Sequence, residues 1–279
     1  MQKPDLDIVG RVHGPVVFDY SCKDVILYAL GVGAGPDDLS LIYEEAPGGL
    51  RVLPSFCLVP AMQMLLQLAE GVYWPRFIHA EQVIRVPRPL PPEGRLIQQG
   101  QVKAIYDRGK AAIYKVEING NLENGAPAYQ TQWTIFYLGA GGFGGEPGPK
   151  GEEVESPPGA EPNFALTDRV ATNQAALYRL SGDLNPLHID PAAAKRSGFD
   201  KPILHGLCTY GFAVRSVVMG PLQGKVDRLR EFRARFSAPV HAGDTLTTNG
   251  WAWRGGYLIQ MESQNGTVLN NGLALVSDG

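Results

Sequence analysis

Hydrophobic and polar residues in the second half of the chain follow two patterns in turn. Between Gly206 and Met219 nearly every position is apolar or small, which is typical of a helix buried on all sides. Beyond it, apolar and polar residues alternate in four stretches separated by glycines, which predicts half-buried strands. These stretches are residues 226–239, 244–254, 256–264 and 267–276. We therefore expect a long buried helix covered by an antiparallel sheet.

Two shorter helices are predicted ahead of the buried one. Thr172 can cap the first of them and Gly182 can end it. Its apolar face is expected to consist of Ala176, Leu177 and Leu180. Asp190, with the proline that follows it, can begin the second helix, and Gly198 can stop it. Both helices would lie between the middle of the chain and the long helix.

The middle of the chain, residues 139–163, differs in composition from both halves. It is rich in Gly, Pro and Glu and begins Gly-Ala-Gly-Gly-Phe-Gly-Gly. Such a segment cannot bury a core and favours an extended linker or a surface crossing. It divides the chain into an N-terminal unit, residues 1–138, and a C-terminal unit, residues 164–279.

The two halves match one another at an offset of 150 or 151 residues. Three pairs of blocks carry the match: 27–30 with 177–180, 53–57 with 204–208, and 85–89 with 235–239. Their common offset indicates a duplication of one unit. A long buried helix wrapped by an antiparallel sheet is the hot-dog arrangement. We therefore predict an α+β double hot-dog, a tandem repeat whose two sheets meet edge to edge and so cover exposed edge strands.

Composition and charge are those of an ordinary globular protein. The chain is 44% hydrophobic and 19% charged, and its net charge of −3 does not fit a nucleic-acid binder. No apolar stretch reaches the roughly 18 residues needed to cross a bilayer. The three scattered cysteines, Cys22, Cys57 and Cys208, are typical of reduced thiols in an intracellular protein.

One run in the second half concentrates the candidate chemistry. Tyr178-Arg-Leu-Ser-Gly-Asp183-Leu-Asn185-Pro-Leu-His188 places an acid, an amide and an imidazole just after the expected end of a helix. Because Asn-Pro favours a turn, the imidazole can fold back toward the carboxylate. Such a pair can share one water, take a proton from it and deliver another. Taken singly, Asp183 and His188 fit a local cap and an ordinary loop histidine better, and the functional interpretation depends on the whole run.

A second candidate stands where the buried helix begins, at His205-Gly206. The first N–H groups of a helix lack internal partners and carry partial positive charge. A glycine there lets a carbonyl oxygen approach the backbone closely, although tight packing would also explain it. Together with the acid and the imidazole, this N–H predicts chemistry at a carbonyl compound.

Three other chemistries find less support. Asp183, His188 and His205 could bind a metal, but no two histidines are four residues apart on a helix and no Cys-x-x-Cys occurs. Cys208 could be a nucleophile beside His205, but it lies in the apolar helix, where a thiol is usually inert. Gly31-Val-Gly-Ala-Gly35 follows a helical stretch rather than a strand, which does not fit a dinucleotide loop. We expect neither a metal nor a cofactor.

These blocks resemble the hydratase 2 signature of the MaoC-like family. The run from Tyr178 to His188 and the run from Pro202 to Gly211 carry it. Further blocks at 27–35, 141–145 and 234–240 extend it over nearly the whole chain. Members, which include the hydratase part of peroxisomal multifunctional enzyme type 2, are double hot-dog enzymes that hydrate trans-2-enoyl-CoA to (3R)-3-hydroxyacyl-CoA without a metal or redox cofactor. The resemblance implies an (R)-specific enoyl-CoA hydratase of fatty-acid metabolism.

The resemblance also implies roles for individual residues. Asp183 and His188 would hold and activate the water, Asn185 would order their loop, and the N–H of Gly206 would polarise the thioester carbonyl. The expected substrate and CoA contacts are His79, Ala80, Arg108, His205 and Phe236. Two of these depart from the family pattern, since Ala80 stands where glycine is usual and Arg108 where lysine is usual.

The first repeat is not expected to hold a second copy of this site. At the same offsets, Gly33, Asp38 and Ser55 stand opposite Asp183, His188 and Gly206. The acid, the imidazole and the oxyanion glycine are therefore all missing from it. In the family this repeat accommodates long or branched acyl chains, so the resemblance implies medium- to long-chain substrates.

Two further functions stay open at this point. A hot-dog thioesterase would direct the same water at the carbonyl carbon, and a non-catalytic acyl-CoA binding or scaffold protein would need no acid–base pair. The family favours a homodimer. A reduced, soluble chain fits the cytoplasm or the peroxisomal matrix, although the C-terminus lacks a peroxisomal tripeptide. We expect acyl-CoA and water as partners, and neither nucleic acid nor a membrane.

Overall fold

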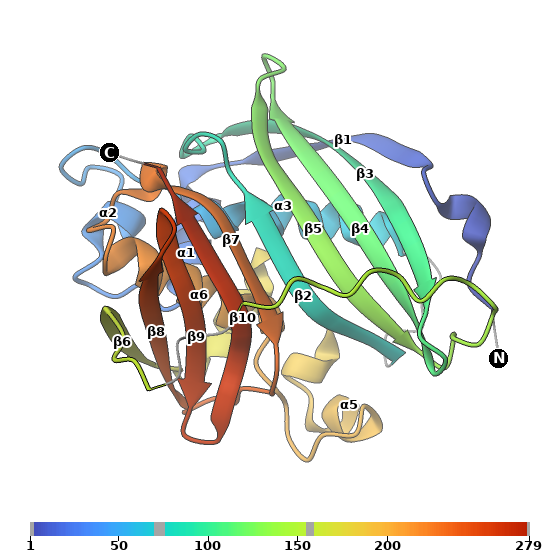
Figure 1. The fold of residues 1–279 in the computed structure, drawn as a ribbon. Helices are drawn as coiled ribbons and strands as arrows, with labels where there is room; N and C mark the ends of the chain where they lie inside the picture. The colour runs from blue at the N-terminus through green and yellow to red at the C-terminus, as the bar shows by residue number, and fades with distance from the viewer. Residues whose placement is uncertain (1–2, 70–75, 155–158, 278–279) are drawn as a thin grey trace.

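Ten strands form one continuous antiparallel sheet in the computed structural model, which describes residues 3–69, 76–154 and 159–277 (Figure 1). The strands of the first half are β1 (Val12–Tyr20), β2 (Phe77–Arg85), β3 (Gly94–Asp107), β4 (Ala111–Leu122) and β5 (Pro127–Leu138). Those of the second half are β6 (Phe164–Arg169), β7 (Leu229–Phe236), β8 (Thr245–Trp253), β9 (Gly256–Ser263) and β10 (Gly266–Val276). The predicted α+β architecture is confirmed.

The helices lie on one face of this sheet, behind the strands in Figure 1. They are α1 (Cys22–Gly31), α2 (Leu39–Ile42), α3 (Leu58–Leu68), α4 (Gln174–Tyr178), α5 (Pro191–Arg196) and α6 (Gly206–Met219). Short 3-10 turns occupy Leu6–Ile8, Pro54–Cys57, Arg179–Ser181, Pro186–His188 and Val226–Arg228. Within the described residues, no helix has both the length and the apolar character needed to cross a membrane.

The strand order reveals the two repeats. It runs β1-β3-β4-β5-β2 in the first half and β7-β10-β9-β8-β6 in the second, so each half has the same connectivity and the two meet at β2 and β7. These two strands pair antiparallel, with Val83 opposite Arg233. Because these two positions are themselves 150 residues apart, a two-fold relation between the repeats passes through this pair. The double arrangement predicted from the offsets is confirmed, and the junction covers one edge of each sheet.

Helix α6 is the buried helix that the apolar pattern predicts. All of its residues from Leu207 to Val218 are buried. It packs closely on the first repeat, because a Cβ at Gly211 would lie 2.3 Å from Cγ1 of Val32. Helix α5 also follows the prediction: the side chain of Asp190 accepts a hydrogen bond from the Ala192 N–H at 2.8 Å and so caps it.

Helix α4 differs from the prediction in its cap and its buried face. It begins after Asn173 rather than Thr172. Its buried side chains are Gln174 and Tyr178, whereas Leu180 is 58% exposed. The reason is that α4 packs against the end of another helix instead of against the sheet. The Gln174 amide donates to the carbonyls of Leu30 and Gly31 at the end of α1, at 3.1 and 2.7 Å.

The described residues between 139 and 163 form neither helix nor strand and cross the sheet face that points away from the helices (Figure 1). The start of the crossing segment is bound to the end of β3. There the carboxylate of Asp107 accepts the N–H groups of Gly142 and Gly144, each at 2.8 Å. These bonds, led by the one from Gly142, lower the pKa of Asp107 to about 2. The glycine-rich block 141–145 is therefore held against the β3–β4 turn by hydrogen bonds.

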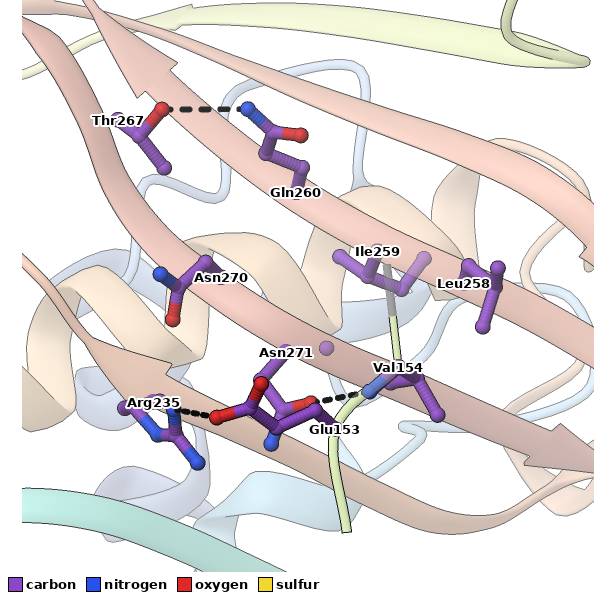
Figure 2. Close-up of a pocket in the computed structure, with 10 residues that line it drawn as sticks. Glu153, Val154, Arg235, Leu258, Ile259, Gln260, Thr267, Asn270 and Asn271 are labelled. Atoms are coloured by element: carbon purple, nitrogen blue, oxygen red, sulfur yellow. Dashed lines mark hydrogen bonds and ion pairs between the residues drawn. The ribbon is translucent and has the colours of Figure 1, made fainter. Parts of the chain in front are cut away.

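Farther along, two acidic residues of the crossing segment reach arginines on β7. Glu152 lies 3.2 Å from Arg233 and Glu153 lies 3.6 Å from Arg235. A groove of about 440 Å³ lies between this segment and strands β9 and β10. Figure 2 shows how the segment contacts the strands of the groove: Glu153 pairs with Arg235, and the Val154 N–H donates to Asn271 Oδ1. Because neighbouring side chains of a strand point to opposite faces, this groove lies across the sheet from Phe236.

Candidate active site

The candidate loop is folded by its own polar side chains. Gly182 has a φ of +120°, which a side chain would disfavour, and it turns the chain out of the helical stretch. The Asn185 N–H donates to Asp183 Oδ1 at 3.2 Å, and Asn185 Oδ1 accepts the Leu187 N–H at 3.0 Å. These two bonds place His188 back over the acid, as the Asn-Pro turn predicts.

Asp183, His188 and His205 come together at one place. Their potential ligand atoms all lie within 4.8 Å of one another. Nδ1 of His188 lies 2.9 Å from the carbonyl oxygen of Ile203. Because a carbonyl only accepts, Nδ1 carries the proton of the neutral ring and Nε2 is left as an acceptor. Burial lowers the pKa of His188, although the Asp183 carboxylate opposes this effect.

The imidazole of His205 lies beneath that of His188. The centroids of the two rings are 3.9 Å apart. Its Nε2 lies 3.1 Å from the backbone carbonyl oxygen of Asp183, so Nε2–H donates there. The residue is 1% exposed, and burial lowers its pKa to about 2. His205 is therefore neutral in the working range of the protein. The Tyr178 ring also packs against His205, with the two ring centroids 4.9 Å apart.

Two histidines and an aspartate within this distance could bind a metal ion as well as a water. The ring proton of each histidine is directed to a backbone carbonyl, which leaves one bare nitrogen on each ring. One oxygen of the Asp183 carboxylate already accepts the Asn185 N–H. That the cluster holds a water rather than a cation stays a prediction.

Gly206 is the first residue of α6, directly after His205. Its N–H has no partner inside the helix and points out at the positive end of the helix dipole. A Cβ at this position would lie 3.3 Å from Cε1 of Phe236, so glycine keeps space between the helix start and that ring. Cys208, two residues on, is fully buried and donates from Sγ to the Gly31 carbonyl at 3.2 Å. Burial raises the pKa of Cys208, which does not fit a nucleophile.

The predicted substrate contacts divide into two groups. His79 lies 4.8 Å from Phe236, ring to ring, and stacks on Trp133 at 4.9 Å, so these residues continue the wall that starts at Gly206. Ala80 occupies the irregularity of β2 between His79 and Glu81. Burial lowers the pKa of His79 to about 4, so its ring is neutral at neutral pH. Sequence reasoning missed Trp133, because only the strand register brings it to His79.

Arg108 lies apart from this wall. It stands in the exposed turn between β3 and β4, where its Nη2 donates to the Pro149 carbonyl of the crossing segment at 3.3 Å. The structure therefore attaches Arg108 to the surface segment, and its contact with CoA stays a prediction.

The first repeat has filled the space of its missing site. A Cβ at Gly33, the position opposite Asp183, would lie 2.2 Å from the Phe212 ring of α6. Asp38, the position opposite His188, forms an ion pair with Arg215 at 3.2 Å. The same guanidinium also pairs with Asp168. An aromatic ring and a buried ion cluster thus replace the acid and the imidazole.

A mostly apolar cavity of about 280 Å³, with Lys3 and Asp5 also in its lining, lies in the first repeat, between α3 and the sheet. Phe77 and Ile135 line it, and these residues neighbour His79 along β2 and across the β2–β5 pairing. Leu65 and Leu68 of α3 line the opposite side. The cavity therefore begins near the far end of the wall formed by Gly206, Phe236 and His79.

Fold and site together define a double hot-dog protein with an acid–imidazole pair beside a helix N-terminus. The description "MaoC like domain" matches residues 153–271, and "MFE-2 hydratase 2 N-terminal domain" matches residues 18–139. The chain belongs to the MaoC-like hydratase 2 family, as its signature predicts.

Relatives of known name cover most of the chain. "Probable enoyl-CoA hydratase 2" of Dictyostelium discoideum is 33% identical and covers 96% of this chain and 95% of that protein. The solved structure of full-length peroxisomal multifunctional enzyme type 2 from Drosophila melanogaster superposes with a TM-score of 0.83 at 31% identity, over 94% of this chain and 48% of that one. A Mycobacterium tuberculosis protein described as a double hotdog fold matches at 14% identity and a TM-score of 0.63, over 96% of each chain, which shows the fold alone.

Proposed function

We propose that this protein hydrates trans-2-enoyl-CoA to (3R)-3-hydroxyacyl-CoA in fatty-acid metabolism. The observation that carries the proposal is the meeting of the Asp183 carboxylate and the His188 imidazole, whose Nε2 is left as an acceptor, beside the first N–H of α6 at Gly206. Named relatives are enoyl-CoA hydratases, which supports the same activity. The site provides a base for water and a donor for a thioester oxygen, and this reaction needs both.

The acid–imidazole pair acts on one water. The Asp183 carboxylate and Nε2 of His188 both accept its hydrogen atoms and so orient its oxygen toward C3 of the substrate. As the O–C3 bond forms, Nε2 takes a proton from the water, and the Asp183 charge stabilises the imidazolium. A positioned base of this kind contributes about 10²- to 10⁴-fold to the rate.

The electrons of the C2–C3 double bond move into an enolate as water adds. The Gly206 N–H donates to the thioester oxygen, which becomes negative at this moment, and the dipole of α6 supports it. The imidazolium of His188 then returns its proton to C2, which restores the thioester and the neutral base. Because one imidazole serves both carbons, the hydroxyl and the proton reach the same face of the substrate.

The acyl chain passes from this site into the first repeat. Phe236 and His79 form the wall next to Gly206, and the apolar cavity beyond them has room for several methylene groups. We assign acyl-chain accommodation to residues 1–138, the crossing to residues 139–163 and catalysis to residues 164–279. Medium- to long-chain substrates follow from this division.

CoA recognition, assembly and compartment complete the proposal. Arg108 lies in an exposed turn, where its charge is free to meet a CoA phosphate once it leaves the Pro149 carbonyl. A homodimer fits the family. The cytoplasm or the peroxisomal matrix fits a protein whose relatives include enzymes with peroxisomal names.

The test follows both possible targets of the water in one reaction. Purified protein is added to trans-2-decenoyl-CoA while the absorbance of the enoyl thioester and the release of free thiol are recorded, and the product is resolved on a chiral column. We expect loss of absorbance, (3R)-hydroxy product and no free thiol. Release of thiol would instead make the protein a thioesterase. Absence of both signals would leave an acyl-CoA binding protein.

A further inference from the structure

His205 makes contacts that differ from those of a substrate-binding side chain. Its Nε2 lies 3.1 Å from the backbone carbonyl oxygen of Asp183, and its ring lies 3.9 Å from that of His188. With 1% of its surface exposed, it is covered by the very loop that carries both groups. It therefore touches the acid's backbone and the base's ring at once.

The hydrogen bond fixes the position of the acid. Besides it, the Asn185 N–H donates to the Asp183 carboxylate, a bond that lies within the turn itself. If this carbonyl rotates, it loses the bond from the buried, neutral imidazole, and the ring N–H of His205 is then left unpaired inside the protein, which is costly. The bond from His205 thus sets the direction in which the Asp183 side chain leaves the backbone.

The stacked ring limits the movement of the base. His188 is anchored at one edge by the bond between its Nδ1 and the Ile203 carbonyl, about which the ring could still tilt. The His205 imidazole closes one face of that ring and permits a narrow range of tilt. Nε2 of His188 is therefore held toward the space that the carboxylate also faces.

His205 is itself held by the first repeat, through Tyr178. The Tyr178 ring lies 4.9 Å from His205 and 6.2 Å from Tyr28 of α1. The two helices are in direct contact here, since a Cβ at Gly31 would meet Cα of Tyr178 at an ordinary contact distance of 3.4 Å. A continuous series of packed groups therefore runs from α1 to the catalytic loop, and the repeat without a site still supports the site of the other.

We propose that His205 is a positioning residue, which aligns the Asp183 carboxylate with Nε2 of His188 through one hydrogen bond and one ring contact. This inference rests on the proposed hydratase function. It departs from the sequence prediction, in which His205 contacts the substrate. A misalignment of about 1 Å between reacting groups costs about 100-fold in rate, so a change at His205 is expected to act on kcat.

Two variants separate the two contacts. His205→Phe keeps a flat ring against His188 but removes the N–H to Asp183. His205→Gln removes the ring but places an amide N–H where Nε2 stands. The measurements are kcat and KM with trans-2-decenoyl-CoA, the Kd of (3R)-3-hydroxydecanoyl-CoA by calorimetry, and the melting temperature. His205→Asn, whose shorter amide does not reach the carbonyl, replaces His205→Phe if that variant does not fold.

We expect His205→Phe to lower kcat by about 10- to 100-fold while KM and Kd stay close to those of the wild type. His205→Gln is expected to recover most of the rate. A rise in KM and Kd at unchanged kcat would make His205 a substrate contact and overturn the inference, as would equal rates in all three proteins. A wild-type rate in His205→Phe alone would show that the hydrogen bond has no part in alignment and would also overturn the inference. Failure of the wild type to hydrate would instead refute the proposed function.

Discussion

The buried neutral His205 has a consequence for stability in acid. Burial lowers the pKa of this side chain to about 2, against about 6.5 in the unfolded chain. At pH 7.5 it is neutral in both states. As the pH falls below 6.5, the unfolded chain takes up a proton that the folded protein refuses. Stability that is fully present above pH 6.5 is therefore lost progressively on acidification.

The size of the loss follows from the proton balance. Between pH 6.5 and the folded pKa, a group protonated only in the unfolded state costs about 1.4 kcal/mol for each pH unit. At pH 5 the contribution of His205 is therefore a loss of about 2 kcal/mol. Burial lowers the pKa of His79 to about 4, so this side chain also reduces the stability in acid, but its contribution stops growing once the pH falls below about 4.

Urea unfolding at pH 7.5, 6 and 5 measures this effect. We expect His205→Phe to lose about 2 kcal/mol less than the wild type between pH 7.5 and 5, because it carries no group to protonate. His205→Gln is the control for loss of the ring, since it differs in packing but is equally unable to titrate. Its pH dependence should therefore match that of His205→Phe. Parallel curves for all three proteins would refute the assignment of His205 as a buried neutral imidazole.

Three further changes test the packing around the site. Gly33→Ala should lower the unfolding free energy, measured by urea titration, by about 1–3 kcal/mol more than the control Gly125→Ala. Both glycines have a positive φ, but of the two only Gly33 faces a ring, that of Phe212, so equal losses would contradict this. Arg215→Met should cost about 3–5 kcal/mol by the same assay, since two partly buried carboxylates lose their partner, and a stability unchanged from the wild type would speak against the cluster. Gly206→Ala should lower kcat by about 10- to 100-fold at unchanged melting temperature, because the new methyl group meets the Phe236 ring and narrows the space beside the backbone N–H; a wild-type kcat would show that the thioester does not need this space.

Local pattern was enough to predict much of the fold. The apolar run of α6 and the alternation in β7 to β10 depend on residues near in sequence, so periodicity identifies them. The offset of 150 residues identifies the duplication, because both repeats retain the same landmarks. The proximity of Asp183 and His188 could be predicted from the sequence because Gly182 and Asn-Pro determine the turn between them.

Contacts across the chain could not be predicted in this way. The buried face of α4 is Gln174 and Tyr178 because its partner is the end of α1, and no periodicity in α4 contains that information. The bond from His205 to the Asp183 carbonyl is made to backbone, which has no sequence signal. The hydrogen bond from Arg108 to the Pro149 carbonyl had no sequence signal either, and the CoA contact that the resemblance implies for Arg108 stays a prediction.

The rate of hydration of trans-2-decenoyl-CoA by Asp183→Asn and His188→Gln, relative to the wild type, tests the central claim most directly. Both substitutions keep the approximate size of the side chain, and the amide oxygen that Asp183→Asn introduces can still accept the Asn185 N–H, so melting temperatures serve as the control for folding. We predict that each variant loses at least about 100-fold in kcat while it remains folded. A folded variant within about tenfold of the wild-type rate would contradict the claim that this pair activates the water.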